Sequence, residues 1–75
     1  MKICSPFAGI VRYHCAAGDC VRMGQTVATV ESIKLEAPVH SPVSGEIQSL
    51  SEADFTDIWG GQELAFINPD KKAEQ

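Results

Sequence analysis

The strongest constraint on the fold is an internal repeat in the sequence. Residues 5–11 (SPFAGIV) are echoed by residues 41–47 (SPVSGEI), so that Ser-Pro, two further residues and Gly recur in the same register. Residues 21–30 (VRMGQTVATV) are echoed in the same way by residues 58–67 (IWGGQELAFI). Two copies of one short pattern predict a single fold with pseudo-twofold symmetry.

The spacing of the copies indicates that the second half is one residue longer. The first pair of segments is 36 residues apart and the second pair is 37 residues apart. The inserted residue must therefore lie between Gly45 and Ile58. We expect it in the polar stretch 51–55, because surface loops tolerate insertions. The halves then span about residues 3–30 and 39–67.

Each half has the pattern of short β-strands. Strand-favouring residues gather in four segments, 10–14, 26–30, 46–50 and 63–67. Glycines stand between such segments, at positions where a positive φ is often required: Gly9, Gly18, Gly24, Gly45 and Gly61. No window has convincing helical periodicity, and residues 51–59 are expected to form a loop or a single turn. The sequence predicts an all-β fold, a small flattened β-barrel or sandwich of two half-repeats with about eight short strands.

Length and composition favour one globular domain. The chain has 75 residues, of which 44% are hydrophobic and 21% are charged. We expect the domain to span residues 1–68 and to be followed by a polar, mobile tail, residues 69–75. No segment approaches the roughly 20 apolar residues of a membrane span, and no signal peptide opens the chain. A cytoplasmic protein without a membrane partner is therefore expected.

Charge and cysteine content argue against two further classes of site. The net charge is −4 and the basic residues are scattered, whereas nucleic-acid binding needs a concentrated positive surface. Cys4, Cys15 and Cys20 are odd in number and lack the two-residue gap of a zinc or redox pair. His14 stands beside Cys15, but ordinary packing explains this better than metal ligation. We expect reduced, partly buried thiols, no metal site and no nucleic-acid partner.

A single lysine lies at the junction of the two halves. Residues 31–38 (ESIKLEAP) join the copies, and Lys34 is the only lysine between Lys2 and the tail. The flanking segments 26–30 and 35–39 are strand-like, which predicts a hairpin with Lys34 exposed at its tip. The turn lacks Asn-Gly or Asp-Gly, and Ile33 is a poor residue for a tight turn, so this prediction rests on the repeat.

The surroundings of Lys34 favour an acceptor over a catalyst. A Schiff-base or general-base lysine needs burial or a cationic neighbour, and neither is near in sequence. The acidic neighbours Glu31 and Glu36 should instead favour the charged amine. We therefore predict no catalytic residue, and a Lys34 amine that fits the role of an acceptor.

The sequence around Lys34 resembles the attachment region of biotin carboxyl carrier domains. The resemblance is carried by residues 30–36 (VESIKLE) and 41–45 (SPVSG), and it extends over almost the whole chain. The first copy also has the expected turn in residues 18–25 (GDCVRMGQ). In the second copy, Phe55 and Thr56 stand where the family has Gly and Asp.

The attachment loop departs from the family at two positions. The family usually has Met on both sides of the lysine, where this chain has Ile33 and Leu35. Both replacements are apolar and close in volume, although β-branched Ile33 is stiffer than Met. The lipoyl relatives usually carry Asp before and Ala after the lysine, so the resemblance favours biotin over lipoate. It implies attachment at Lys34, with a flanking loop formed by Glu31, Ser32, Ile33, Leu35 and Glu36.

The resemblance also implies a function and partners. Lys34 would carry a covalent biotin as a swinging arm that moves CO₂ from a biotin carboxylase to a carboxyltransferase, for an acyl-CoA or oxo-acid acceptor. The chain would be a non-catalytic carboxylase subunit or domain, and a biotin protein ligase would load it. The alternatives are a lipoyl carrier of a 2-oxo-acid complex and an unmodified adaptor module.

Two aromatic residues lie in the irregular second-copy loop. Phe55 and Trp59 could contact a partner if they were exposed. Tryptophan is substantially buried on average, so we expect partial burial over the edge of the sandwich.

Overall fold

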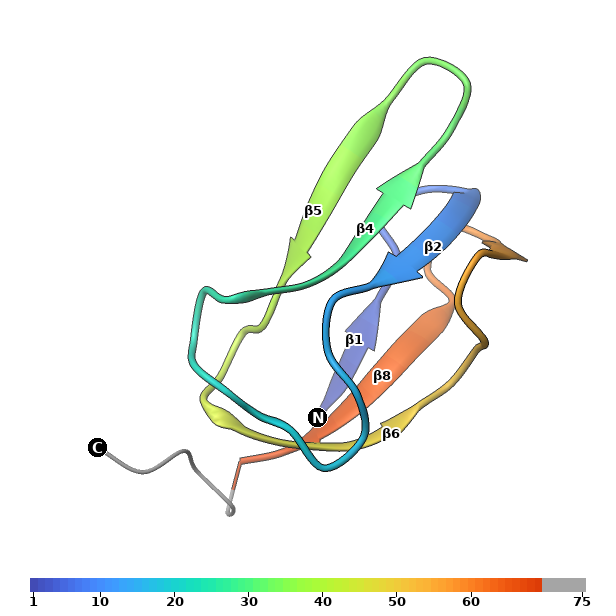
Figure 1. Ribbon diagram of the computed structural model, residues 1–75. Helices are drawn as coiled ribbons and strands as arrows, with labels where there is room; N and C mark the ends of the chain where they lie inside the picture. The colour runs from blue at the N-terminus through green and yellow to red at the C-terminus, as the bar shows by residue number, and fades with distance from the viewer. Residues whose placement is uncertain (70–75) are drawn as a thin grey trace.

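The computed structural model describes residues 1–69, which form eight β-strands in two four-stranded sheets (Figure 1). The strands are β1 (Lys2–Cys4), β2 (Gly9–Tyr13), β3 (Cys20–Val21), β4 (Thr26–Glu31), β5 (Glu36–His40), β6 (Gly45–Leu50), β7 (Thr56–Ile58) and β8 (Glu63–Asn68). One sheet has the order β1-β8-β6-β3 and the other the order β5-β4-β2-β7, and all pairs are antiparallel. The predicted all-β sandwich is confirmed.

The strand orders display the predicted pseudo-twofold symmetry. The repeat relates β1 to β5, β2 to β6, β3 to β7 and β4 to β8. Replacing each strand of the first sheet by its repeat partner gives the order of the second sheet. Each half contributes two strands to each sheet, so the halves interlock and neither forms a sheet without the other.

The two Ser-Pro turns are the same at the level of hydrogen bonds. Ser5 and Ser41 are buried, and each hydroxyl donates to the backbone carbonyl two residues ahead. The acceptors are Phe7, at 2.6 Å from the Ser5 hydroxyl oxygen, and Val43. The buried hydroxyls are thereby satisfied within the turn that leads into β2 or β6.

The inserted residue lies in a strand and not in a loop. β2 pairs with β4 without interruption, whereas the register of β6 against β8 skips Gln48 between Ile47 and Ser49. A β-bulge of this kind admits one residue while the strand continues on both sides. The expected position in residues 51–55 is therefore wrong.

Residues 51–59 also contain more structure than predicted. Thr56–Ile58 forms strand β7, which pairs with β2 at the edge of its sheet. The segment was expected to be a loop because three residues are too few to show a periodic pattern. The third of them, Ile58, is buried and anchors the strand to the core.

Gly9 and Gly45 are required because another strand's backbone passes too close for a side chain, and not because their φ is positive. A Cβ atom on Gly45 would lie 2.5 Å from the carbonyl oxygen of Asn68, and one on Gly9 would collide with that of Glu31. The expectation of a positive φ is wrong at these two positions. It is confirmed at the other three, Gly18, Gly24 and Gly61.

The core lies between the two sheets and comes from both halves. Its largest fully buried hydrophobic side chains are Val11, Val21, Val27, Val30, Ile47, Leu64 and Ile67. Each such side chain contributes about 1.5–3 kcal/mol to folding. Val30 fixes the end of β4, so the hairpin that follows projects from a rigid base.

The tail predicted for residues 69–75 lies outside the described residues except for Pro69. Within residues 1–69, there is no helix of the length and hydrophobicity needed to cross a membrane.

Candidate functional site

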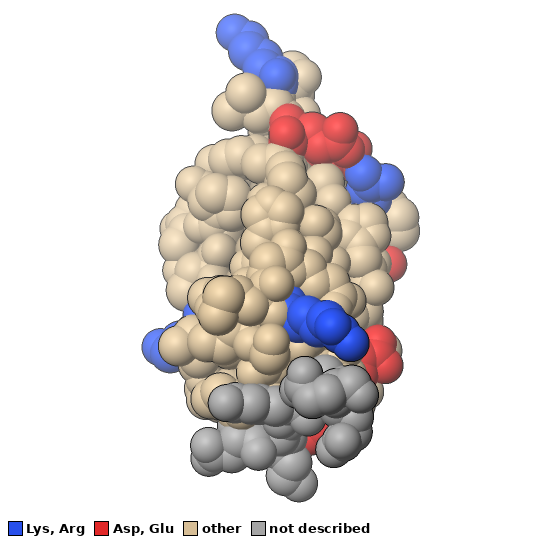
Figure 2. All heavy atoms as spheres, turned by 90° about the vertical axis from the view of Figure 1, so that its left-hand side faces the viewer, with Lys and Arg blue, Asp and Glu red and all other residues tan. Residues whose placement is uncertain are grey.

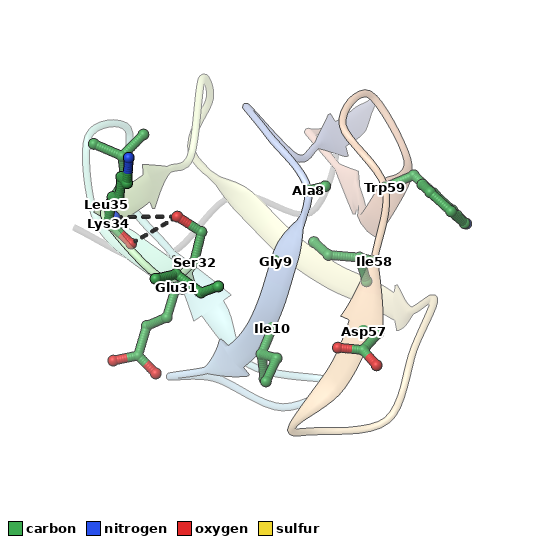
Figure 3. Close-up of a pocket in the computed structure, with 11 residues that line it drawn as sticks. Ala8, Gly9, Ile10, Glu31, Ser32, Lys34, Leu35, Asp57, Ile58 and Trp59 are labelled. Atoms are coloured by element: carbon green, nitrogen blue, oxygen red, sulfur yellow. Dashed lines mark hydrogen bonds between the residues drawn. The ribbon is translucent and has the colours of Figure 1, made fainter.

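The junction between the halves is a tight hairpin turn at one end of the molecule (Figure 1). Glu31 of β4 pairs with Glu36 of β5, and the four residues between them close the turn. The Ser32 amide donates to the Leu35 carbonyl at 2.7 Å, and the Leu35 amide donates to the Ser32 hydroxyl at 3.1 Å (Figure 3). The Ser32 side chain therefore closes the turn by a bond to a nearby backbone amide, as Asn and Asp side chains do in other turns. The predicted hairpin with Lys34 at its tip is confirmed.

The side chains at the tip are exposed to solvent. Ile33 is fully exposed, and Lys34 and Leu35 are also exposed. In Figure 2, basic atoms protrude from the top of the molecule, where the β4–β5 turn lies. No hydrogen bond or ion pair found among residues 1–69 involves Lys34. A free amine on an exposed turn fits a covalent acyl group, because nothing must be displaced for it to react.

The acidic neighbours of Lys34 are bound to a different cation. Arg12 on β2 reaches across β4, and its Nη2 atom lies 3.2 Å from Glu31 and 2.8 Å from Glu36. Neither carboxylate forms an ion pair with Lys34 within residues 1–69. Sequence reasoning missed Arg12, because its contacts depend on the register of three strands and no local motif marks them.

A hollow lies beside the tip. Its volume is about 1130 Å³, and it opens to solvent between the β4–β5 turn and β7 (Figure 3). The lining comes from three segments, residues 8–10, 31–35 and 57–59. The hairpin forms one wall and β7 the opposite wall, so the tip and the β7 edge border the same space.

The two aromatic residues of the second copy are exposed. Phe55 is 68% exposed and Trp59 is 78% exposed, so the expected partial burial is wrong. The reason is that β7 is an edge strand in which Ile58 occupies the inward position. In Figure 3 the Trp59 side chain points away from the hairpin and out from the sheet edge.

The three cysteines are free thiols in different surroundings. Cys4 and Cys20 are exposed, and only Cys15 is partly buried as expected. Burial raises the pKa of the Cys15 thiol, and Asp19 raises that pKa further. His14 forms a 2.7 Å hydrogen bond with Thr29. Across residues 1–69, no three His, Cys, Asp or Glu side chains are grouped as a metal site.

Comparison with known proteins explains the hairpin. Residues 1–67 match the family model of biotin and lipoyl attachment domains, described as biotin-requiring enzyme. The chain belongs to the biotinyl/lipoyl attachment family. Biotinyl/lipoyl domains are carrier modules of enzyme complexes and are not themselves catalytic, and they carry a covalently attached biotin or lipoate.

Proteins similar to this biotinyl/lipoyl domain include a component of a 2-oxoglutarate dehydrogenase complex, a glycine cleavage system protein and a carboxylase. The dihydrolipoyllysine-residue succinyltransferase component of the mitochondrial 2-oxoglutarate dehydrogenase complex of Saccharomyces cerevisiae is 35% identical over 52 residues, which is 69% of this chain and 11% of the yeast protein. The probable glycine cleavage system H protein of Aeropyrum pernix is 51% identical over 35 residues, which is 47% of this chain and 24% of that protein. The Kluyveromyces lactis urea carboxylase superposes with a TM-score of 0.81 at 25% identity, covering 91% of this chain and 6% of the carboxylase. The chain thus spans a small part of each of these proteins.

Proposed function

We propose that Lys34 is the attachment residue of this biotinyl/lipoyl domain and that the attached group is biotin. One observation carries the proposal: Lys34 is an exposed lysine, free of partners within the described structure, at the tip of the hairpin that joins the two halves. Residues 1–68 would form the carrier domain, and its place of action would be the cytoplasm.

Attachment needs only the amine from this chain. In the reaction we propose, the Lys34 amine loses a proton to solvent and attacks the carbonyl carbon of a cofactor whose carboxyl group a ligase has activated. A C–N bond forms, the activating group leaves with its electron pair, and a second proton is lost to give the amide. Glu31, Ser32, Ile33, Leu35 and Glu36 would present the amine to the ligase.

Once attached, biotin supplies a ring nitrogen that can hold CO₂. The chain supplies a rigid platform and a flexible stem, which keep the group at an effective concentration of about millimolar at neighbouring active sites. The partners we propose are a biotin carboxylase, a carboxyltransferase that acts on an acyl-CoA or an oxo acid, and a biotin protein ligase. The likeness to a urea carboxylase and the apolar residues on both sides of Lys34 support biotin.

Lipoate is the second candidate for the group on Lys34. The yeast relative is named for its dihydrolipoyllysine residue, and this supports lipoate independently of the fold. The same amide chemistry at the same lysine would serve either cofactor. The two candidates therefore differ in the ligase and the partner enzymes, and not in the site.

The intact mass of the purified protein tests the proposal. We expect the protein from cells with biotin and an active biotin protein ligase to gain one biotinyl group. Lys34→Arg should remain unmodified, and Lys2→Arg should be modified as the wild type is. A gain of one lipoyl group with lipoate ligase would assign lipoate instead. An unmodified wild type, with both ligases active on control carriers, would favour an unmodified adaptor module.

A further inference from the structure

The edge strand β7, together with the residue on either side of it, presents three exposed side chains at alternate positions. Phe55, Asp57 and Trp59 are exposed, whereas Ile58 between the last two is buried. We call Phe55, Asp57 and Trp59 the β7 edge. Figure 3 shows Asp57 and Trp59 on the side of the hollow opposite the hairpin.

Phe55 has an unfavourable backbone conformation. Its φ is 61°, in the left-handed region, and its amide donates to the Val11 carbonyl at 2.7 Å. The equivalent residue of the first half is Gly18, with a φ of 95° and the same 2.7 Å bond to the carbonyl of Ile47. The left-handed conformation is unfavourable for any residue with a Cβ atom, and least so for glycine, which has none. Phe55 recovers little of this by burial, because most of its side chain is in solvent.

The first half provides an internal comparison for the β7 edge. The repeat places Gly18, Cys20 and Arg22, in and around edge strand β3, at the positions of Phe55, Asp57 and Trp59. The same backbone therefore forms with small or charged residues at these positions. The fold does not require the aromatic pair, and strained or exposed residues that the fold does not require indicate a role outside the fold.

Asp57 differs from the other carboxylates on this face of the sheet. Glu31 and Glu36 are both paired with Arg12. No cation within residues 1–69 pairs with Asp57. The β7 edge thus combines two exposed aromatic rings with one unpaired negative charge, which is complementary to a surface with an apolar pocket and a basic residue.

We propose that the β7 edge is the docking surface of the enzyme that acylates Lys34, and this rests on the attachment proposed above. The hollow connects the two, because Lys34 and Trp59 both line it. Before acylation the amine extends only on its own four-carbon stem. The acylating enzyme must therefore come close enough to cover the tip and the hollow, whereas later partners reach the longer, loaded arm. An apolar pocket of that enzyme would receive Phe55 and Trp59, and a basic residue would pair with Asp57.

Steady-state acylation kinetics test this proposal, with the carrier as the varied substrate and the biotin protein ligase, biotin and ATP held constant. If lipoate is the group found, lipoate and its ligase are used. We expect Phe55→Gly and Trp59→Ala each to raise KM about tenfold with kcat little changed, because they remove docking contacts and not reacting groups. Asp57→Asn should raise KM less and should abolish the increase of KM with salt.

Two controls separate docking from stability. Phe55→Gly should raise the free energy of unfolding, because glycine relieves the left-handed strain, so its loss of acylation efficiency cannot come from unfolding. Met23→Ala removes a side chain that is 69% exposed in the turn preceding β4, at the other end of that strand from the tip, and should leave KM unchanged.

Several outcomes would overturn the proposal. If both aromatic variants are acylated with a KM within about twofold of the wild-type value, the β7 edge is not the docking surface. The proposed attachment at Lys34 would be unaffected by that result. A wild-type dimer that Trp59→Ala converts to a monomer with unchanged KM would assign the surface to a second copy of the chain. A wild type that no ligase acylates would instead remove the attachment itself, and the docking proposal with it.

Discussion

At the level of single residues, the outer face of the β5-β4-β2-β7 sheet brings like charges together. Glu31 and Glu36 are direct cross-strand partners, and Ile10 and Asp57 continue the same row onto β2 and β7. Two carboxylates opposite one another destabilise a strand pair. Arg12 offsets this by binding both, and so it holds the base of the hairpin that carries Lys34.

We predict that Arg12→Gln loosens the hairpin tip with little effect on the rest of the fold. The loss in unfolding free energy should be about 1 kcal/mol or less, because both ion pairs are partly exposed. Hydrogen exchange measured by NMR should become faster at the amides of Ser32 and Leu35, which close the turn.

A matched arginine variant provides the control for this prediction. Arg22→Gln also removes one positive charge, but Arg22 lies in no ion pair of the described structure, and exchange at the tip should not change. Adding Glu36→Gln to Arg12→Gln should slow the exchange again, since it removes the repulsion. Equal exchange rates at the tip in the two single variants would refute the role of Arg12.

Lys34 could be predicted from the sequence and Arg12 could not. Lys34 is marked by its position as the one lysine at the junction of two repeats. The role of Arg12 depends on which residues of β4 and β5 lie beside it, and the register is visible only in the fold. Phe55 had a visible signal, because it replaces the glycine of the first copy, but its exposure did not follow from the sequence.

At the level of elements, the two Ser-Pro turns should contribute equally to stability. Ser5→Ala and Ser41→Ala each remove a buried hydroxyl and leave one partly buried carbonyl without its donor, and each should cost about 1 kcal/mol. Because the turns lie in different halves and share no partner, the costs should add in the double variant. Urea unfolding of the three variants measures this. If only one of the two substitutions lowers the free energy of unfolding, the two turns have the same backbone geometry but contribute differently to stability.

Most of the strands could be predicted because the repeat supports each of them twice. β7 and the bulge at Gln48 could not. A strand of three residues has no periodicity to read, and it exists because Ile58 packs into the core beside β2. The position of the bulge depends on the register in which β6 pairs with β8. The spacing of the repeats in the sequence shows only that the second half has one extra residue.

At the level of the whole molecule, two partly buried acidic groups, the Tyr13 hydroxyl and the Cys15 thiol, should set the alkaline limit of stability. Burial is the main cause that raises the pKa of both Cys15 and Tyr13. The folded state therefore keeps these protons at pH values where the unfolded state has lost them. The resulting stability is complete below the ordinary pKa values and is lost as pH rises through the raised ones.

We expect the free energy of unfolding to fall as pH rises above about 9, and to continue to fall above about 10. Urea unfolding between neutral pH and about pH 11 measures this. Tyr13→Phe should be less stable at neutral pH, since the Tyr13 hydroxyl donates to the Leu64 carbonyl at 2.7 Å, but its decline with pH should be shallower. An equal decline in Tyr13→Phe and in wild type would assign the alkaline limit to other groups.

The hydrogen bond between the Met1 amino group and the Ile67 carbonyl, at 2.8 Å, has a consequence for how this domain can be built into larger proteins. By the pseudo-twofold symmetry, the hairpin from β4 to β5 corresponds to the gap between β8 and β1, so the beginning of β1 and the end of β8 lie side by side, away from Lys34 (Figure 1). Polypeptide fused to either end would leave the domain at the pole opposite the lysine. Fusion partners could then tether the domain without covering Lys34, and a longer tether would enlarge the volume that Lys34 can reach.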